Sequence, residues 1–261
     1  MPRAGRLIAI LALLLAGVAD LRAQDAVPAN ATDSRGEGRA VNFRLLAPNI
    51  ASDQKRIWTS PREVIRKRNW LPALAIASVT AGLVATDART GHYFRNTNTF
   101  SGFNSVFTGT ATAAAIAVAP AALYAAGSIR RDPYATHTAL LAGEALAGGE
   151  VVGIVLKDLM RRRRPQDFGL HQDMSGSWFS RTNGLLTGVG SFPSEHSIAA
   201  FSTATIVARR YRRHKWIPYA AYGLSTVIGF SRLTTAAHFP SDVFAGAAIG
   251  YGIGRFVVLR Q

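Results

Sequence analysis

The stretch SRLTTAAHFPSD, residues 231–242, lies between two apolar runs and carries Arg232, His238 and Asp242 on one short segment. An always-charged guanidinium suits a phosphate, and a histidine with a carboxylate four residues later suits an activated nucleophile. Pro240 favours the first turn of a helix, so Asp242 is expected in that turn and His238 just before it. Asp242 can then hold one imidazole nitrogen and leave the other to attack. By itself the segment also fits an ordinary surface or capping pair, so other parts of the chain must decide.

The composition of the chain favours association with a membrane. Of its 261 residues, 48% are hydrophobic and only 17% are charged, which is little charge for a soluble enzyme. Thirty Lys and Arg against 15 acidic residues give a net charge of +15, which suggests nucleic acid or an anionic membrane surface as partner. The basic residues form short clusters at the ends of apolar runs, as at 66–68 and 209–213, and this fits loops beside a membrane. We therefore expect a membrane-associated protein and no nucleic-acid partner.

The first 69 residues precede the long apolar segments. Residues 1–23 combine a basic start, an apolar stretch and small residues at its end, which predicts a secretory signal peptide, with an uncleaved anchor helix as the alternative. Residues 24–69 have a loop-like composition followed by a short amphipathic stretch, and we interpret them as a linker and amphipathic segment. Residues 70–261 are the expected functional domain.

From residue 70 onward, apolar segments rich in Ala, Gly and Thr alternate with short polar breaks. These segments are too long and too Ala-rich for strands, so they predict helices. We expect an all-α fold with a six-helix core bundle. The expected helices are 70–86, 103–127, 136–160, 195–211, 216–231 and 240–259. A long irregular loop at about 165–192 separates the third helix from the fourth, and a loop of that length in a compact domain is usually functional.

The relation of these helices to a bilayer is left open by the sequence. Only 103–127 is comfortably long and uncharged for a span, whereas the third helix carries Glu144 and Glu150. Six spans would place the basic clusters at 66–68, 130–131 and 209–215 on one side, which is the positive-inside pattern. Such an arrangement starts in the cytoplasm, but a chain with a cleaved signal peptide starts outside. A helical periplasmic domain resting on the membrane resolves that conflict, and both readings are retained.

A second charged segment ends the third predicted helix. Lys157 and Arg164 are seven residues apart, about two helical turns, so they lie on nearly one face and can grip an anion from two sides. Pro165 ends the helix there. The three arginines between them, residues 161–163, are interpreted as a solvated or topology-setting charge run.

A third segment, GSFPSEHS at 190–197, opens the fourth predicted helix. Ser194 before Glu195 and His196 reads as a helix N-cap with the first-turn amides unpaired. Free amides, a serine hydroxyl and the positive end of a helix dipole make a phosphate-binding corner that His196 can face. An ordinary capped helix with a solvent-facing histidine is the alternative.

Taken together, the three segments supply three cations, two histidines and one aspartate. One histidine can attack phosphorus while the other protonates the leaving oxygen. We expect neither a metal nor another cofactor, because no carboxylate cluster is present to hold magnesium and three cations can neutralise the anion. The absence of cysteine excludes a thiolate nucleophile or a thiolate metal site.

The spacing within these segments resembles a known superfamily. Lys157-x6-Arg164-Pro165, Pro193-Ser194-x-His196 and Ser231-Arg232-x5-His238-x3-Asp242 resemble the three signature motifs of the type-2 phosphatidic acid phosphatase and vanadium haloperoxidase superfamily. Their order matches as well, and the motifs with their helices cover roughly residues 100–259. The resemblance implies an all-helical core bundle of that kind and a phosphohistidine mechanism without metal.

The resemblance also implies roles for the catalytic side chains. His238 would be the nucleophile and Asp242 its orienting partner. His196 would be the general acid and later the general base for water.

The remaining motif residues would bind the phosphoryl group. Lys157, Arg164 and Arg232 would clamp its oxygens, together with Ser194 and the amide of Glu195. One residue departs from the pattern, since the superfamily usually has glycine at the position of Glu195. The amide survives this change, but a carboxylate beside a phosphate repels it unless the side chain is turned away or paired with a nearby arginine.

The leading hypothesis is a phosphatase of the bacterial cell envelope that hydrolyses a phosphomonoester or pyrophosphate, with a lipid-linked phosphate as substrate. The apolar helices and the aromatic loop motivate the lipid. We expect it in the periplasm, or in the inner membrane with the site facing the periplasm. The alternatives are a vanadium-dependent haloperoxidase and a non-catalytic envelope protein that binds anionic lipid headgroups.

Overall fold

The computed structural model describes residues 39–66, 70–180, 184 and 186–259. The expected signal peptide at 1–23 lies outside the described residues. The expected all-α fold is confirmed, because every regular element in the described part of the chain is helical. The elements are α2 (Leu46–Arg66), α3 (Trp70–Asn96), α4 (Ser101–Val106), α5 (Gly109–Ile129), α6 (Pro133–Met160), the 3₁₀ turn η1 (Pro165–Asp167), α7 (Glu195–Arg210), α8 (Trp216–Thr234), α9 (Pro240–Gly252) and the π-helical turn η2 (Ile253–Val258).

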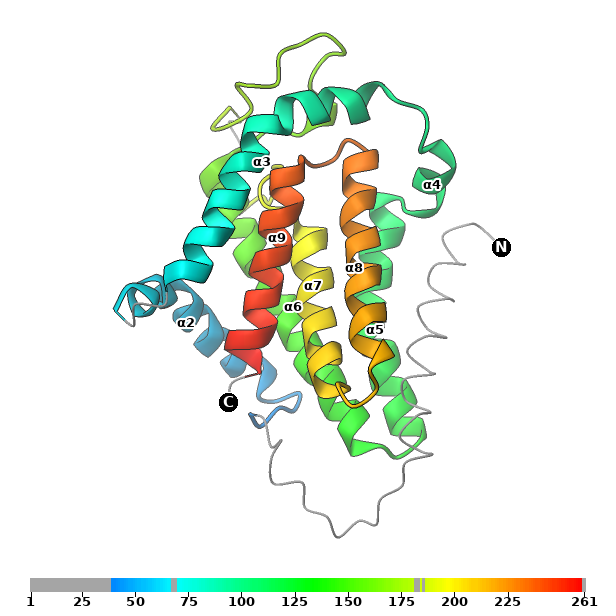
Figure 1. Ribbon diagram of the computed structural model, residues 1–261. Helices are drawn as coiled ribbons and strands as arrows, with labels where there is room; N and C mark the ends of the chain where they lie inside the picture. The colour runs from blue at the N-terminus through cyan, green and yellow to red at the C-terminus, as the bar shows by residue number, and fades with distance from the viewer. Residues whose placement is uncertain (1–38, 67–69, 181–183, 185, 260–261) are drawn as a thin grey trace.

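Helix α7 is the centre of the bundle. It packs against α5, α6, α8 and α9, while α3 leans along α9 from outside (Figure 1). Close packing is possible because α7 and α9 carry small residues where they cross. A Cβ on Gly250 would lie 2.3 Å from the carbonyl oxygen of Ile198, closer than any side chain tolerates. Glycine is therefore required at this crossing, and it brings the start of α9 beside the start of α7.

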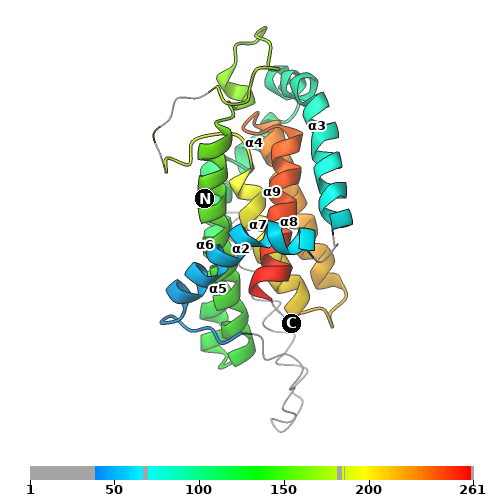
Figure 2. The same cartoon turned by 90° about the vertical axis from the view of Figure 1, so that its left-hand side faces the viewer.

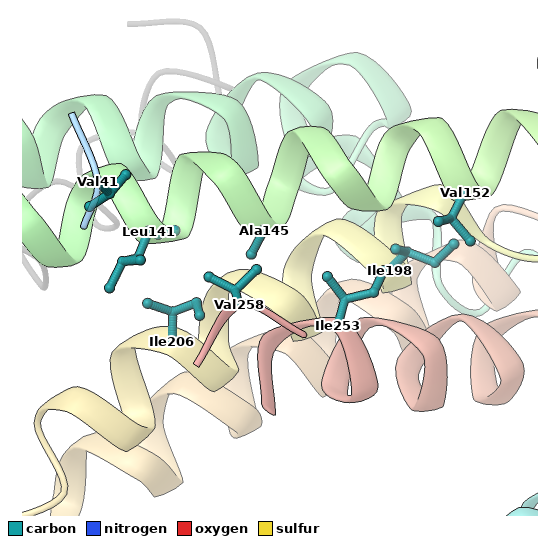
Figure 3. Packing of buried hydrophobic residues seen from close by; sticks show 9 residues of the cluster. Val41, Leu141, Ala145, Val152, Ile198, Ile206, Ile253 and Val258 are labelled. Carbon is teal, nitrogen blue, oxygen red and sulfur yellow. The ribbon is translucent and has the colours of Figure 1, made fainter. Parts of the chain in front are cut away.

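The largest apolar cluster joins α6 to α7 and to the C-terminal turn. Val152 of α6 and Ile198 of α7 are buried beside Ile253 of η2 (Figure 3). The other buried members are Val41, Leu141, Ala142, Ala145, Ile206 and Val258. Each large aliphatic side chain that is fully buried contributes about 1.5–3 kcal/mol. This cluster therefore fixes the register between the two helices that carry Lys157 and His196.

The N-terminal segment differs from the expected linker, since Leu46–Arg66 forms helix α2, which crosses α6 (Figure 2). Asn49 Nδ2 donates to Glu144 Oε2 at 3.1 Å. The Arg39 guanidinium lies 2.6 Å from Asp53 Oδ1 and 3.0 Å from Glu144 Oε1. These polar partners hold α2 on the bundle and satisfy a carboxylate inside an apolar helix. A local reading of composition could not show the contact between Asn49 and Glu144, because these residues are 95 positions apart in the sequence.

The six expected helices are present with shifted ends. The first runs on to Asn96, and the last ends at Gly252, where the chain continues as the π-helical turn η2. Short α4 was not expected. The second expected helix begins at Gly109 instead of residue 103, because residues 101–106 form the separate helix α4. The other three end within a few residues of their expected limits.

Three of the described helices, α3, α5 and α6, are long and apolar enough by length and composition to cross a membrane. The sequence had singled out only the second of them as comfortable. Helix α3 has an apolar window that is only 6% buried inside the protein. Its exposed apolar side chains include Trp70, Leu71, Leu74, Ile76 and Val79.

The two ends of the bundle differ in character. The basic connections between α5 and α6 and between α7 and α8 lie at one end, and the chain around α6–α7 and α8–α9 lies at the other (Figure 1). The three motif segments therefore meet at the end opposite to residues 130–131 and 209–215. The basic cluster at 66–68 lies partly outside the described residues.

Candidate active site

His238 lies in the short connection between α8 and α9, where it is only 4% exposed. Ala236 adopts a left-handed conformation with φ of 51°, and the amides of Ala237 and His238 donate back to the Arg232 carbonyl at 3.0 and 3.1 Å. This tight turn ends α8 and directs His238 into the bundle end. Its Nδ1 lies 2.7 Å from the carbonyl oxygen of Ser191. A carbonyl only accepts, so Nδ1 carries the proton and Nε2 holds the lone pair.

Asp242 supports this histidine mainly through other groups. Its Oδ2 is 3.7 Å from His238 Nδ1, which is beyond a hydrogen bond. The carboxylate instead accepts from the Phe239 amide at 2.7 Å and from the Ser191 hydroxyl. It thereby holds both the start of α9 and the residue whose carbonyl binds His238. Burial lowers the pKa of His238, and the nearby Asp242 carboxylate opposes that shift.

Arg162 corrects the interpretation of residues 161–163 as a solvated charge run. Its side chain is 1% exposed, and its NH1 donates to Asp242 Oδ1 at 2.6 Å. The guanidinium lies 4.1 Å from the ring centroids of both Trp178 and Phe239. Arg161 ends α6 in a left-handed conformation with φ of 46°, and this turn points the next side chain inward. Counting charges along the sequence cannot reveal such a turn.

Asp87 is a further buried group that the sequence reading missed. It lies in α3 and accepts from Arg162 NH2 at 2.7 Å and from the Ser241 amide at 3.2 Å. It therefore anchors α3 to the first turn of α9. In the sequence, the signal for Asp87 is a single carboxylate directly after an apolar segment.

The three predicted cations approach the histidines from different elements. Lys157 is 1% exposed and forms an ion pair with Glu195. The positive charges of Lys157 and Arg164 lie close enough to His238 to help lower its pKa, and the charge of Arg232 does the same for His196. The structure therefore brings the predicted cations and histidines to one place.

Two of these cations are held by neutral oxygens. Arg164 Nε donates to the Gly190 carbonyl at 3.2 Å. Arg232 donates through NH2 to the Phe107 carbonyl and to Thr112 Oγ1, the latter at 3.2 Å. Carbonyls and hydroxyls orient a guanidinium without cancelling its charge, so both remain able to bind an anion.

Ser194 and His196 begin α7 as expected. Ser194 caps the helix, with Oγ accepting from the Ser197 amide at 3.4 Å, and its own amide donates to the Asp242 carbonyl at 3.0 Å. His196 Nε2 lies 3.1 Å from the Gly109 carbonyl at the start of α5. Since a carbonyl only accepts, Nε2 carries the proton of the neutral ring and Nδ1 holds the lone pair. His196 lies outside the three candidate membrane-spanning helices, and burial, with the Arg232 charge, lowers its pKa to about 4.

A pocket of about 120 Å³ opens beside His196. Glu150, Glu195 and His196 form its polar wall. Its apolar wall consists of Ala113, Ile116, Ala117, Leu146 and Ala199 from α5, α6 and α7. Among the described residues, no three His, Asp or Glu side chains gather as metal ligands.

A helical bundle that gathers two histidines, three cations and a capped helix start at one end is suited to binding and transferring a phosphoryl group. Residues 137–261 match the sequence model of the PAP2 superfamily. All three motif segments fall within the matched residues.

Two curated relatives match shorter stretches. A lipid A 1-phosphatase of Porphyromonas gingivalis is 38% identical over 70 residues, which are 26% of this chain and 16% of the relative. A bacitracin transport permease protein, BcrC, of Bacillus licheniformis is 34% identical over 67 residues, or 26% of this chain and 32% of the relative. The matches thus span less than a third of either relative.

A solved structure is also similar. The PAP2-type phosphatidylglycerolphosphate phosphatase of Bacillus subtilis gives a TM-score of 0.47 at 18% identity, covering 70% of this chain and 92% of that one.

Proposed function

We propose that this protein is a phosphatase that hydrolyses a lipid-linked phosphomonoester or pyrophosphate through a phosphohistidine, without a metal. The observation that supports this most directly is the buried His238, whose Nδ1 lies 2.7 Å from the Ser191 carbonyl. That contact fixes the tautomer with a lone pair on Nε2, and burial lowers the pKa of His238, which favours the neutral ring. A neutral imidazole fixed beside several cations is an activated nucleophile for an anionic substrate.

In the first step, Nε2 of His238 attacks phosphorus while the bond from phosphorus to the leaving oxygen breaks. The three cations, Lys157, Arg164 and Arg232, stabilise the equatorial oxygens. His196, which takes up a proton on Nδ1 when the anionic substrate binds, gives that proton to the leaving oxygen. Positive charge that develops on the His238 ring is stabilised by the Ser191 carbonyl and by Asp242, 3.7 Å from Nδ1.

In the second step, water attacks the phosphohistidine. His196, now neutral, takes a proton from the water, and the P–N bond breaks to return the electron pair to His238 Nε2. Orthophosphate leaves, His196 releases its proton to the solvent, and both histidines return to their starting states. Ser194 and the Glu195 amide complete the anion site at the start of α7, where the helix dipole favours negative charge.

A lipid-linked substrate in the cell envelope is supported by three features. The pocket beside His196 has an apolar wall, and three helices are long and apolar enough to cross a membrane. Two of the similar proteins are named for phosphatases of lipid A and of phosphatidylglycerolphosphate. We place the protein in the inner membrane or on its periplasmic side, with the site facing the periplasm.

The test is phosphate release by the detergent-solubilised full chain from a panel of lipid and soluble phosphates, with a chelator present throughout. We expect release from at least one lipid phosphate and a loss of at least 10³-fold in His238→Ala. Activity that survives His238→Ala would exclude the proposed nucleophile. Halide oxidation after vanadate loading, without phosphate release, would instead support a haloperoxidase, and lipid binding without turnover would support a binding protein.

A further inference from the structure

Glu195 lies inside the candidate site, at the position where the superfamily motif usually has glycine. Its Oε2 is 2.6 Å from Lys157 Nζ, and the two side chains are 23% and 1% exposed. The carboxylate is therefore neither turned away nor paired with an arginine, which were the two outcomes considered from the sequence. It is bound to one of the cations that would hold the phosphoryl group.

The surrounding backbone has room for this side chain. A Cβ on Gly153 of α6 would lie 2.8 Å from Glu195 Cγ, so any larger residue there would push the carboxylate away from Lys157. Gly188, at φ of +61°, would bring a Cβ to 3.5 Å from Glu195 Oε1. Gly153 and Gly188, which come from separate segments, thus leave the space that the Glu195 side chain occupies, so the fold determines its position.

A second carboxyl group lies on the same side of the site. Glu150 and Glu195 both line the pocket beside His196. Lys157 interacts electrostatically with both of them as well as with Arg164. The Glu195 carboxylate therefore offsets the charge of Lys157 and concentrates negative charge on the side of His196.

The position of these carboxylates matters because His196 is the proposed acid. An acid must lie beside the oxygen that leaves, so the leaving group occupies the side of the site that Glu150 and Glu195 line. An alcohol leaving group is uncharged and can donate a hydrogen bond to a carboxylate. The leaving group of a pyrophosphate is itself a phosphate, which the Glu195 carboxylate would repel.

We propose that Glu195 determines specificity by favouring a phosphomonoester of a hydroxyl-bearing lipid headgroup over a pyrophosphate. This inference rests on the proposed function and narrows its substrate class. Gly153 is a positioning residue that acts through Glu195.

The test uses the ratio of two activities measured on the same protein, so that differences in folded fraction between variants cancel. For wild type, Glu195→Gln and Glu195→Gly, we would measure kcat/KM for a lipid monophosphate and for the diphosphate of the same lipid, in one detergent. We expect wild type to prefer the monophosphate. Removing the carboxylate should raise the ratio of diphosphate to monophosphate activity by roughly 10-fold or more.

Two further variants sharpen the result. Gly153→Ala keeps the charge but displaces it, and it should shift the ratio in the same direction. Asp158→Asn makes the matched charge change on α6 at a side chain that bonds Thr187, and it should leave the ratio at the wild-type value. An unchanged ratio in both Glu195 variants would overturn the inference.

A binding measurement separates this inference from the proposed function. We would titrate the same proteins with inorganic phosphate and inorganic pyrophosphate and compare the dissociation constants. Glu195→Gln should tighten pyrophosphate relative to phosphate by roughly 10-fold. This readout needs no turnover, so absent hydrolysis would reject the phosphatase alone, whereas an unchanged binding ratio would reject the role of Glu195.

Discussion

At the level of single residues, the site has two histidines held by backbone carbonyls and, behind them, a buried group of one arginine and two carboxylates. His238 and His196 are oriented by backbone carbonyls, those of Ser191 and Gly109. Behind them, Arg162 joins the carboxylates of Asp87 and Asp242 at 2.7 and 2.6 Å. A carbonyl fixes a tautomer without adding a full charge, while the two buried carboxylates are neutralised by Arg162.

Removing Arg162 should therefore destabilise the protein more than removing its neighbour. Arg162→Ala leaves Asp87 and Asp242 buried without their cation, and breaking a buried pair in this way costs about 3–5 kcal/mol. Arg163→Ala removes a guanidinium that lies 4.0 Å from the Phe168 ring centroid and bonds the Asp167 carbonyl, and it should cost about 1 kcal/mol or less. Thermal unfolding in detergent measures both. Equal losses would contradict the structural role of Arg162.

The low pKa of His196 has a consequence for ligand binding. With a pKa of about 4, the empty site holds His196 neutral at pH 5–6. A bound dianion favours the imidazolium and raises that pKa, so binding should take up close to one proton in this range. Sulfate is a suitable probe because it does not itself titrate there.

Titration calorimetry of sulfate in buffers with different ionisation enthalpies counts the protons taken up. His196→Gln should abolish the uptake while still binding the anion through the cations. The same shift affects stability, because a histidine whose pKa is lowered from 6.5 to about 4 on folding costs stability as pH falls through that interval. Uptake that persists in His196→Gln would assign the proton to another group.

At the scale of elements, the site depends on how closely α9 approaches α7. Gly250 sits where these helices cross, with the Ile198 carbonyl 2.3 Å from a would-be Cβ. Gly250→Ala should force the helices apart, at a cost of about 1–3 kcal/mol, and shift Asp242 at the other end of α9. Phosphatase activity should fall more than the folded fraction does, because small displacements of catalytic groups are costly.

The matched control is Gly223→Ala in α8. A Cβ there meets nothing within 4 Å, so alanine should be neutral or stabilise the helix by about 1 kcal/mol. Melting temperature and activity of both variants would be compared. Equal effects at the two glycines would contradict the importance of the crossing.

The helices could be predicted to different extents. Ala-rich apolar segments are readable locally, so six helices were expected and are present. Helix α2 was not expected, because Asn49 and Asp53 become informative only when Glu144 and Arg39 are placed beside them. The same reason hid Arg162, which appears in the sequence as one of four consecutive arginines.

At the scale of the whole molecule, the motif spacing predicted which side chains meet, but not how they are joined. Lys157, His196 and His238 are close together, as expected. The contact between His238 and Asp242 is longer than a hydrogen bond, and the ion pair of Lys157 with Glu195 was not foreseen. Order and spacing predict which side chains gather, whereas the contacts of Arg162 with Asp87 and Asp242 join distant helices and could not be read from the sequence.

The orientation of the bundle in the membrane is directly testable, because the motif segments and the basic loops lie at opposite ends (Figure 1). The sequence contains no cysteine, so a single introduced cysteine reports one position. Ser175→Cys places a thiol in the exposed loop between α6 and α7, and Arg212→Cys places one in the exposed α7–α8 connection. In spheroplasts, a membrane-impermeant maleimide should label the first variant and should reach the second only after permeabilisation. Equal labelling of both would support a bundle resting on the periplasmic surface, and the reverse pattern would place the candidate site in the cytoplasm.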